Sequence, residues 1–335
     1  MPAADQMLAA LLDVPEAPFR LTEVAKPVPR PGEVLVRIKA SGVNPLDLKI
    51  QAGQAAHARQ SLPAVLGIDL AGIVEEPGPG VSGFSRGDAV FGMTGGVGGL
   101  QGSLAEYAAV DADLLARQPT GLSMREAAAL PLIFITAWEG LVDRAHVAAG
   151  QKVLIHGGAG GVGHVAIQIA RAFGAEVFAT GSAKSLALIG QFGATAIDYQ
   201  KETVMDYVAR HTQGRGFDIV FDTVGGATLD ASFGAVRRYG HVVSALGWGS
   251  HALAPLSFRG ATYSGIFTLL PLLSGEGRAH HGDIMREAAK LIDAGMLSVR
   301  LDPRKFTLSN IDDAHVAQKD GSAKGKIVID ITEAQ

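Results

Sequence analysis

The stretch VLIHGGAGGVGHVAIQIARAFGA, residues 153–175, decides the fold. It has the pattern of a short apolar strand, a glycine-rich turn and an amphipathic helix that ends at a glycine. The turn contains Gly158-x-Gly160-x-x-Gly163, a spacing that carries little weight alone in a chain with 43 glycines. Its place between a strand and a helix makes it specific, because dinucleotide-binding units carry the same pattern at that point.

Each of these glycines has a predicted task in a phosphate-binding turn. We expect Gly158 to allow the tight turn, Gly160 to let the backbone approach a pyrophosphate, and Gly163 to let helix and strand pack closely. The free N–H groups at the start of the helix would then face the phosphates. A glycine-rich turn without a ligand is the alternative. The predicted phosphate-binding residues are Gly158, Ala159, Gly160, Gly161, Val162 and Gly163.

Strand-like and helix-like segments alternate around this turn, from about residue 123 to residue 261. The first helical segment begins with Ser123 as its predicted N-cap and Glu126 three residues later. Six apolar strands separated by helices predict an α/β fold with a doubly wound, six-stranded parallel sheet covered on both faces. The predicted strands are KVLIH, AEVFAT, ATAIDY, FDIVFDT, HVVSALG and ATYSGIF.

The sequence on either side of this region has a different secondary-structure pattern. Residues 33–110 contain short alternating strands separated by Gly, Pro and Asp, which predicts a mostly β domain. The last seventy-odd residues are too few to form a domain alone, so we expect them to complete the first one. A chain of 335 residues therefore divides into a domain of residues 1–122 with 262–335 and an inserted domain of residues 123–261.

Composition excludes several classes of protein. A net charge of −4 gives no general attraction to nucleic acid or anionic membranes. The chain start lacks the pattern of a secretory signal, and the longest apolar stretch, residues 127–138, is shorter than the roughly 20 residues of a membrane span. We therefore expect a soluble, cytoplasmic protein. The absence of cysteine excludes disulfides, thiolate catalysis and every zinc site that needs sulfur.

The end of the second predicted strand indicates which dinucleotide binds. NAD-selective sites place an acid there to accept hydrogen bonds from the ribose 2′-OH. Glu176 stands at the far end of that strand, whereas Ser182 and Lys184 follow its carboxyl end. A hydroxyl and an ammonium suit a 2′-phosphate, so we predict NADPH, with Tyr199 flanking the adenosine phosphate. The alternatives are a solvated Lys184 and a Tyr199 that only packs against its neighbours.

The chain resembles, over nearly its whole length, the zinc-independent quinone oxidoreductases of the medium-chain dehydrogenase/reductase superfamily. This resemblance implies a GroES-like catalytic domain, a Rossmann domain that binds NADPH, and a homodimer formed by joining sheets. The segments that carry it are SGVNPLDLKIQAG, LGIDLAGIVEEPGPGVSGFSRGDAVFG, GSLAEYAAV, LPLIFITAWEGL, the glycine turn and GKIVIDI.

The same resemblance bears on zinc. Asn44 stands where zinc-dependent relatives have a cysteine ligand, and Gly67-Ile68-Asp69 replaces the motif that supplies a histidine. The four-cysteine lobe is replaced by GMTGGVGGLQGS. The resemblance therefore implies no metal. Among the remaining histidines, we expect His57, His280 and His281 to lie in solvated loops, because they lack ligand spacing.

The resemblance also implies site residues. Asn44 and Asp47 match a polar pair beside the nicotinamide, and Thr136 matches a threonine that contacts the nicotinamide amide. As alternatives, Asn44 is a favourable turn residue and Asp47 a cap for a helix that begins at Leu48. His156 and Asp222 end predicted strands near the site, and we interpret both as structural residues and not as catalytic ones. The residues that match walls around the nicotinamide are Leu246, Gly247, Ile266 and Phe267.

These residues predict hydride transfer to a quinone or other conjugated carbonyl compound, because such acceptors react without a metal to polarise the carbonyl. Asn44 is a hypothetical hydrogen-bond donor to the developing oxyanion, and no general acid is evident. Leu48-Lys49 replaces a tyrosine found in several quinone reductases. An enone or enoyl-thioester reductase and a non-catalytic NADPH-binding protein are therefore the alternatives.

Overall fold

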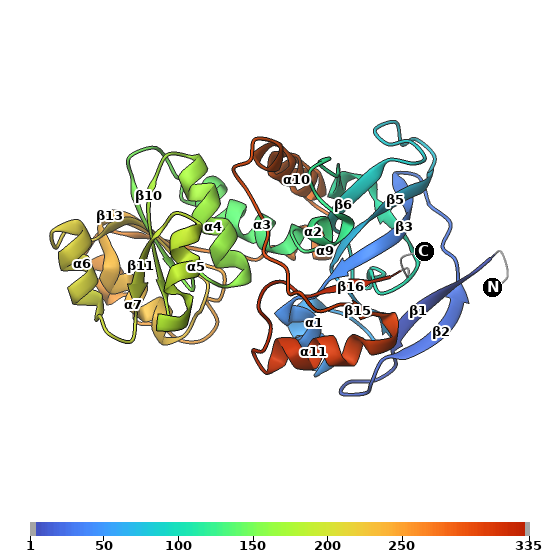
Figure 1. The fold of residues 1–335 in the computed structure, drawn as a ribbon, viewed down its shortest axis with the longest axis horizontal. Helices are drawn as coiled ribbons and strands as arrows, with labels where there is room; N and C mark the ends of the chain where they lie inside the picture. The colour runs from blue at the N-terminus through green and yellow to red at the C-terminus, as the bar shows by residue number, and fades with distance from the viewer. Residues whose placement is uncertain (1–4, 332–335) are drawn as a thin grey trace. The chain divides into compact units, whose positions relative to one another are not determined.

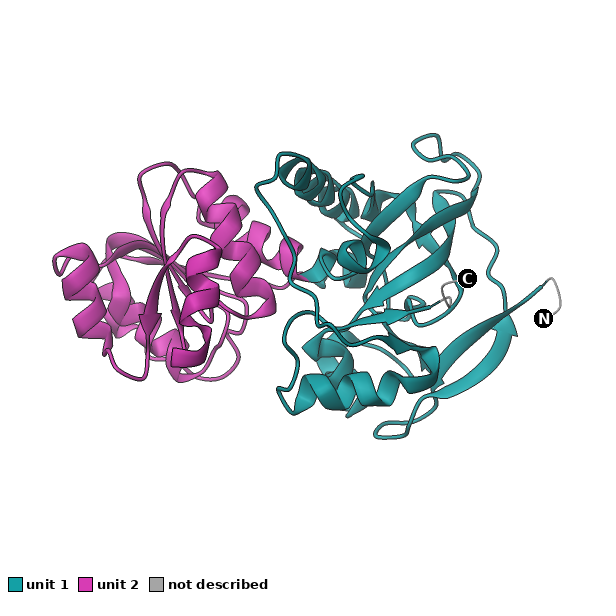
Figure 2. Ribbon diagram, in the orientation of Figure 1, with its two compact units in different colours: residues 1–132, 269–335 teal, residues 133–268 magenta. Residues whose placement is uncertain are grey.

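This computed structural model describes residues 5–331 of the chain and divides it into two compact units (Figure 2). Unit 1 comprises residues 1–132 and 269–335, and unit 2 comprises residues 133–268. The sequence placed the first division after residue 122, ahead of Ser123. The division falls later because helix α2, Met124–Ala128, packs against β3 (Glu33–Gly42) and β5 (Asp69–Pro77) of unit 1.

Unit 2 is built on a six-stranded parallel sheet with the order β11-β10-β9-β12-β13-β14. This confirms the predicted α/β class and the doubly wound sheet. Strand order runs outward in opposite directions from β9 and β12, whose carboxyl ends form the switch point where such sheets bind ligands. The strands are β9 (Lys152–His156), β10 (Glu176–Gly181), β11 (Thr195–Asp198), β12 (Phe217–Asp222), β13 (Val236–Ser244) and β14 (Thr262–Gly265).

Helices cover both faces of this sheet. Figure 1 shows α4 and α5 on one side of the strands and α6 and α7 on the other. An apolar core lies under α6 and α7, where Phe178 meets Phe217 edge to face at 5.3 Å. The helices are α3 (Pro131–Trp138), the π-helical η3 (Glu139–Arg144), α4 (Gly161–Ala172), η4 (Ala183–Ser185), α5 (Leu186–Gln191), α6 (Val204–Thr212), α7 (Ala227–Ala235) and α8 (Ala254–Ser257).

Unit 1 contains two sheets. A three-stranded sheet joins β2 (Arg20–Ala25), β1 (Gln6–Leu12) and β4 (Ala64–Val65). A larger sheet has β3 near its centre, and β16 from the end of the chain pairs with β3 in antiparallel register, Ile329 opposite Ser41. The C-terminal segment thereby completes unit 1. The other strands of this sheet are β5, β6 (Ala89–Met93), β7 (Tyr107–Asp111), β8 (Leu115–Arg117), β15 (Phe306–Thr307) and β16 (Val328–Asp330).

The helices of unit 1 are mostly short. The predicted capping box before α2 is confirmed: the Ser123 N–H donates to the Glu126 carboxylate at 2.8 Å, and the Glu126 N–H donates to Ser123 Oγ at 3.3 Å. No described helix of either unit is long and apolar enough to cross a membrane. The helices are η1 (Ala56–Ala58), α1 (Pro45–Gln51), η2 (Ala112–Leu114), α2, α9 (Leu270–Ser274), α10 (Arg278–Asp293), η5 (Leu308–Asn310) and α11 (Ile311–Lys319).

Candidate active site

The glycine turn follows β9 at the switch point of the parallel sheet. Its left-handed residue is Gly157, with φ +75°, and Gly158 has an ordinary backbone conformation. The prediction that Gly158 makes the tight turn is therefore wrong by one position. Gly158 is needed for a different reason, since a Cβ there would lie 2.6 Å from Ala179 Cβ on β10.

Gly163 has the close packing that the sequence predicts, while the phosphate contact of Gly160 stays a prediction. A Cβ on Gly163 would lie 2.1 Å from the Gly157 carbonyl oxygen, so only glycine lets α4 pack this close to the strand. Gly160 is the N-cap of α4, and a Cβ added there would have one near neighbour, Gly157 O, at 3.2 Å. A glycine N-cap fits a pyrophosphate, because no side chain stands between a ligand and the N–H groups at the helix N-terminus.

The residues predicted to surround the 2′-phosphate follow two neighbouring strands. Ser182 and Lys184 come directly after β10, and Tyr199 comes directly after β11, whose Asp198 lies opposite Gly181. Lys184 is exposed, and Tyr199 is 57% exposed. The acid of this strand, Glu176, opens β10 and pairs with Lys152 at 2.8 Å, so it lies at the opposite end from the turn.

Two polar residues at the ends of the central strands, His156 and Asp222, make hydrogen bonds to neighbouring strands and turns. His156 is buried, and its Nδ1 lies 3.1 Å from Thr180 Oγ1. Burial lowers the pKa of His156 to about 4, so the ring is neutral near pH 7. Asp222 is fully buried and accepts hydrogen bonds from the Ser244 hydroxyl and the Gly225 N–H. These contacts agree with the structural interpretation of both residues.

The predicted nicotinamide walls gather after β13 and β14. Leu246 N–H donates to Ser244 Oγ at 3.0 Å, and Ile266 N–H donates to Ser244 O at 2.9 Å. A Cβ added to Gly247 would lie 2.2 Å from the Tyr263 hydroxyl, so the Tyr263 side chain would have to shift. Phe267 meets Trp248 edge to face at 6.2 Å. Thr136 lies separately on α3 and is 5% exposed.

In unit 1, Asn44 belongs to a buried polar network that the sequence did not reveal. Its Nδ2 donates to Asp69 Oδ2 at 2.8 Å, and its Oδ1 accepts from the Lys326 ammonium at 2.5 Å. Lys326 also donates to the Val43 carbonyl at 2.7 Å. Asp47 Oδ2 accepts from the Asn44 N–H at 2.8 Å. We call these four side chains, Asn44, Asp47, Asp69 and Lys326, the buried network.

The charges of the buried network are strongly perturbed. Burial raises the pKa of Asp47 to about 7 and that of Asp69 to about 6, although Lys326 and hydrogen bonds oppose the effect. Burial likewise lowers the pKa of Lys326, against the pull of the two carboxylates. Two carboxyl groups share one ammonium away from water. Burial therefore works against the charged form of all three titratable groups.

The local structure corrects the capping alternative for Asp47. Helix α1 begins at Pro45 with Asn44 as N-cap, whereas a cap at Asp47 would need a helix that begins at Leu48. Asp47 lies in the first turn and binds the N-cap backbone. The hypothesis of Asn44 as an oxyanion donor also loses support, because the side chain is fully buried and its amide donates to Asp69.

The histidines named from the sequence lie in helices and not in solvated loops, so that prediction is wrong. His57 lies in η1, and His280 and His281 lie in α10. His281 is fully buried, while His280 is exposed. Within residues 5–331, no three His, Cys, Asp or Glu side chains are arranged as metal ligands.

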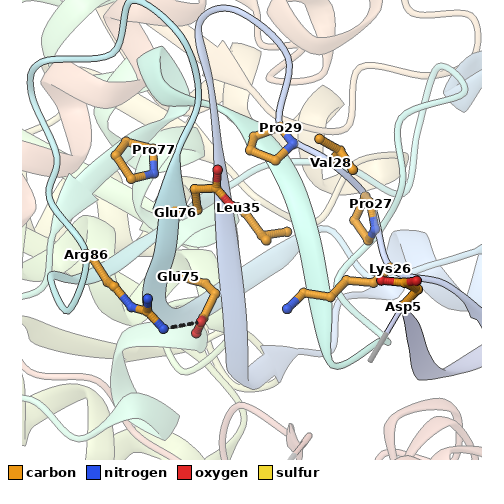
Figure 3. Close-up of a pocket in the computed structure, with 10 residues that line it drawn as sticks. All are labelled: Asp5, Lys26, Pro27, Val28, Pro29, Leu35, Glu75, Glu76, Pro77 and Arg86. Carbon is orange, nitrogen blue, oxygen red and sulfur yellow. Dashed lines mark hydrogen bonds and ion pairs between the residues drawn. The ribbon is translucent and has the colours of Figure 1, made fainter. Parts of the chain in front are cut away.

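A hollow in unit 1 holds none of the predicted site residues (Figure 3). Its volume is about 380 Å³, and Arg86 pairs with Glu75 at its rim at 2.7 Å. Lys26 lies over the Tyr107 ring at 3.8 Å. The remaining lining consists of Asp5, Glu76 and apolar or proline residues, and it has no histidine and no hydroxyl. The hollow is therefore not the candidate site.

Comparisons with known proteins identify two family models. Residues 30–120 match the alcohol dehydrogenase GroES-like domain, and residues 192–329 match a model described as zinc-binding dehydrogenase. Among solved structures, an alcohol dehydrogenase superfamily protein from Novosphingobium aromaticivorans is 58% identical. The match covers 97% of this chain and 100% of that one, with a TM-score of 0.96.

Curated relatives include reductases of several names. A 2-methylene-furan-3-one reductase from Solanum lycopersicum is 36% identical over 316 residues, which is 92% of this chain and 74% of that protein. An NADPH-dependent alkenal/one oxidoreductase from Arabidopsis thaliana, described as chloroplastic, is 34% identical over the same shares. A quinone oxidoreductase from Sus scrofa is 35% identical over 231 residues, 68% of this chain and 69% of that protein.

Proposed function

Because this chain belongs to the medium-chain dehydrogenase/reductase superfamily and is quinone oxidoreductase-like, we propose that it is a zinc-independent, NADPH-dependent reductase of quinones or other conjugated carbonyl compounds. The observation that carries the proposal is the glycine turn. Gly160 leaves space above the N-terminus of α4, and Gly158 and Gly163 have no room for a Cβ. That combination fits a dinucleotide pyrophosphate.

NADPH is the proposed cofactor, and it would supply a hydride from C4 of its nicotinamide. Ser182 and Lys184 follow β10, where an NAD-selective site would place an acid, and Tyr199 follows the neighbouring strand. A hydroxyl and an ammonium there favour a 2′-phosphate over a 2′-hydroxyl. The name of the Arabidopsis relative supports the same preference.

For the nicotinamide, we propose a wall made by residues after β13 and β14. Leu246 and Ile266 are tied to Ser244, which is itself tied to Asp222, so their backbones are fixed. A fixed apolar wall excludes water and holds the ring in one orientation, which is what hydride transfer requires of the protein. The proposed contact residues are Thr136, Leu246, Gly247, Ile266 and Phe267.

The proposed acceptor is a conjugated carbonyl compound. Hydride addition to a conjugated carbon places the negative charge on oxygen through the π-system, so the reaction needs no strong Lewis acid. Two relatives are named as reductases of a methylene-furanone and of alkenals or alkenones, and one is named a quinone oxidoreductase. We therefore propose quinones and enones as the substrate class.

The buried network is the proposed polar contribution of unit 1. Asn44 and Asp47 act through position, because their polar atoms face Asp69, Lys326 and the α1 backbone. Zinc independence rests on the sequence having no cysteine, and on Lys326, whose ammonium already lies 2.5 Å from Asn44 Oδ1. A divalent cation bound at Asn44 would meet that positive charge.

The experiment is a titration of the purified protein with NADPH and NADH, followed by absorbance decay of the preferred cofactor. The acceptor panel is 9,10-phenanthrenequinone, a cyclic enone and an enoyl thioester. Preference for NADPH with turnover of quinone or enone supports the proposal. Turnover of the thioester alone favours the thioester reductase, and tight binding of NADPH without any turnover favours a non-catalytic NADPH-binding protein.

We also propose a homodimer that acts in the cytoplasm. β14 is the edge strand of the unit 2 sheet, and Thr262, Tyr263 and Gly265 on it are exposed. An exposed edge strand pairs readily with a second copy across a twofold axis. Light scattering with size-exclusion chromatography measures the assembly, and cell fractionation measures the location.

A further inference from the structure

An imidazole–carboxylate pair lies in the segment that follows β13. His251 Nδ1 is 2.9 Å from Asp230 Oδ1, and Asp230 belongs to α7. The His251 side chain is 11% exposed and that of Asp230 is 54% exposed. The carboxylate orients the ring through one nitrogen, which leaves Nε2 as the atom available for proton transfer.

This pair lies beside the proposed nicotinamide wall within unit 2. His251 Nε2 is 3.4 Å from the Trp248 carbonyl oxygen, a long and therefore weak contact. The Trp248 ring meets Phe267, one of the proposed wall residues, and Gly247 directly precedes it in sequence. The His251 ring packs edge to face on Phe233 at 6.3 Å, which fixes its plane.

The charged and titratable groups around His251 favour its protonated form. Asp230 on α7 raises the pKa of His251, mainly through the hydrogen bond, and Asp222 at the end of β12 adds to the effect. Burial opposes it. Tyr263 on β14 also packs on Phe233, and burial raises its pKa, so it is neutral near pH 7. These contacts raise the pKa of His251 and so favour its protonated, proton-donating form.

We propose that His251 is the proton donor of the reaction and that Asp230 is its positioning residue, an inference that rests on the proposed function. An enone takes up a hydride from the reduced nicotinamide at its β-carbon. Its C=C electron pair moves toward the carbonyl oxygen and forms an enolate. The Nε2–H bond of His251 then breaks as a C–H bond forms at the α-carbon. The neutral imidazole regains its proton from water.

The two substrate classes differ in their need for this donor. A reduced quinone carries its negative charge on phenolate oxygens, which water protonates rapidly. An enolate must be protonated on carbon, which is slow without a positioned acid. His251 is therefore required for enones and dispensable for quinones. This difference separates a chemical role from a structural one.

The test compares His251→Gln with His146→Gln, a matched control on an exposed histidine of the same unit that bonds to Val142 O. NADPH oxidation is measured with 2-methylcyclopent-2-enone and with 9,10-phenanthrenequinone, and the configuration of the product's α-carbon is determined. We expect enone turnover to fall about 100-fold or more in His251→Gln, with mixed configuration at the α-carbon and unchanged quinone turnover. His146→Gln should match the wild type in all three measurements.

A second readout needs no turnover. NMR titration of the free protein gives the pKa of His251, which we expect above that of a free histidine in the wild type and lower in Asp230→Asn. The alkaline limb of the enone pH–rate profile should move to lower pH in the same variant.

Either of two results overturns the proposal while leaving the proposed function intact: unchanged enone turnover in His251→Gln, or loss of enone turnover in Tyr263→Phe with His251→Gln unaffected. Equal loss with quinone and enone, with the melting temperature retained, also overturns it, since that indicates damage to cofactor binding. A wild-type protein that turns over neither acceptor overturns the proposed function and this proposal together.

Discussion

Gly160→Ala separates phosphate binding from folding. The new Cβ would lie 3.2 Å from Gly157 O, close but not impossible, and it would occupy the open space above the α4 N-terminus. If a phosphate binds there, the methyl group breaks at least one charge-assisted hydrogen bond between the phosphate and the backbone. The binding free energy of NADPH should then weaken by about 1.5–3 kcal/mol. The dissociation constant of NADPH should therefore rise about 10- to 150-fold. The loss of an N-cap glycine should cost at most about 1 kcal/mol of folding stability.

The assay is fluorescence titration with NADPH together with a thermal melt of each variant. Gly190→Ala is the matched control, because Gly190 lies in α5 and a Cβ added there would have nothing within 4 Å. It should leave NADPH affinity unchanged and raise stability by roughly 0.5–1 kcal/mol, as alanine does in a helix interior. Unchanged NADPH affinity in Gly160→Ala would show that no phosphate approaches this residue, and the assignment of the turn would fail.

Three further substitutions test the cofactor preference and the buried network, and a fourth tests the proposed mechanism. Lys184→Ala should weaken NADPH binding about tenfold and leave NADH binding unchanged; equal effects on both cofactors would contradict the 2′-phosphate assignment. Lys326→Met leaves two buried carboxyl groups without their cation, so the free energy of unfolding should fall by about 3–5 kcal/mol at pH 8 in urea titrations, and a cost below about 1 kcal/mol would contradict the pairing. Burial raises the pKa of Asp47 in the folded state from 3.8 to about 7. Its contribution to the free energy of unfolding is therefore complete below pH 3.8 and is lost as the pH rises toward 7. Asp47→Asn should therefore flatten the decline in melting temperature between pH 5 and pH 8, and an unaltered decline would show that other groups cause it. Asn44→Ala should lower the turnover number, because Asp69 and Lys326 both lose a partner, and unchanged turnover would remove Asn44 from the proposed mechanism.

The parallel sheet could be predicted because its determinants are local. Each strand and helix of unit 2 carries its own periodicity, and the glycine turn indicates which edge of the sheet to examine for a ligand site. The exact backbone role of each glycine could not be read in the same way. Gly157 and Gly158 are adjacent, and only the φ angle of +75° at Gly157 shows which one makes the left-handed turn. A sequence motif gives only the spacing of the glycines. Whether a position needs glycine depends on its neighbours in space, such as Ala179 beside Gly158.

The histidines show a second limit of the sequence. His280 and His281 lie close to Gly275, Gly277 and Gly282, a composition typical of a loop. Gly277 is in fact the left-handed N-cap of α10, and Gly282 lies inside the helix, where a Cβ would meet Asp113 O at 2.4 Å. Close packing of α10 against η2 explains that glycine. Local composition does not contain that tertiary contact.

The buried network was missed because its members are brought together only by the fold. Asp69 is 25 residues from Asn44, and Lys326 is 282 residues from it. The segment GKIVIDI carries part of the family resemblance, yet nothing in its pattern shows that its lysine points at Asn44. The pairing of β16 with β3 supplies that information, because it places the end of the chain beside Gly42 and Ser41. Sites assembled by sheet pairing are harder to predict than sites assembled by one turn.

The position of Lys326 has a consequence for the choice of substrate. An ammonium about 5 Å from a divalent cation would oppose its binding by about 7 kcal/mol at an effective dielectric constant of about 20. The two nearby carboxyl groups offset part of this repulsion where they are ionised, although burial raises the pKa of both. The proposal that no metal binds at Asn44 rests on the missing cysteine and histidine and on the ammonium of Lys326 beside Asn44. Without a metal to polarise a simple ketone, the hydride needs an acceptor that delocalises its own charge. The proposed absence of a metal and the proposed conjugated substrate are therefore consistent with each other.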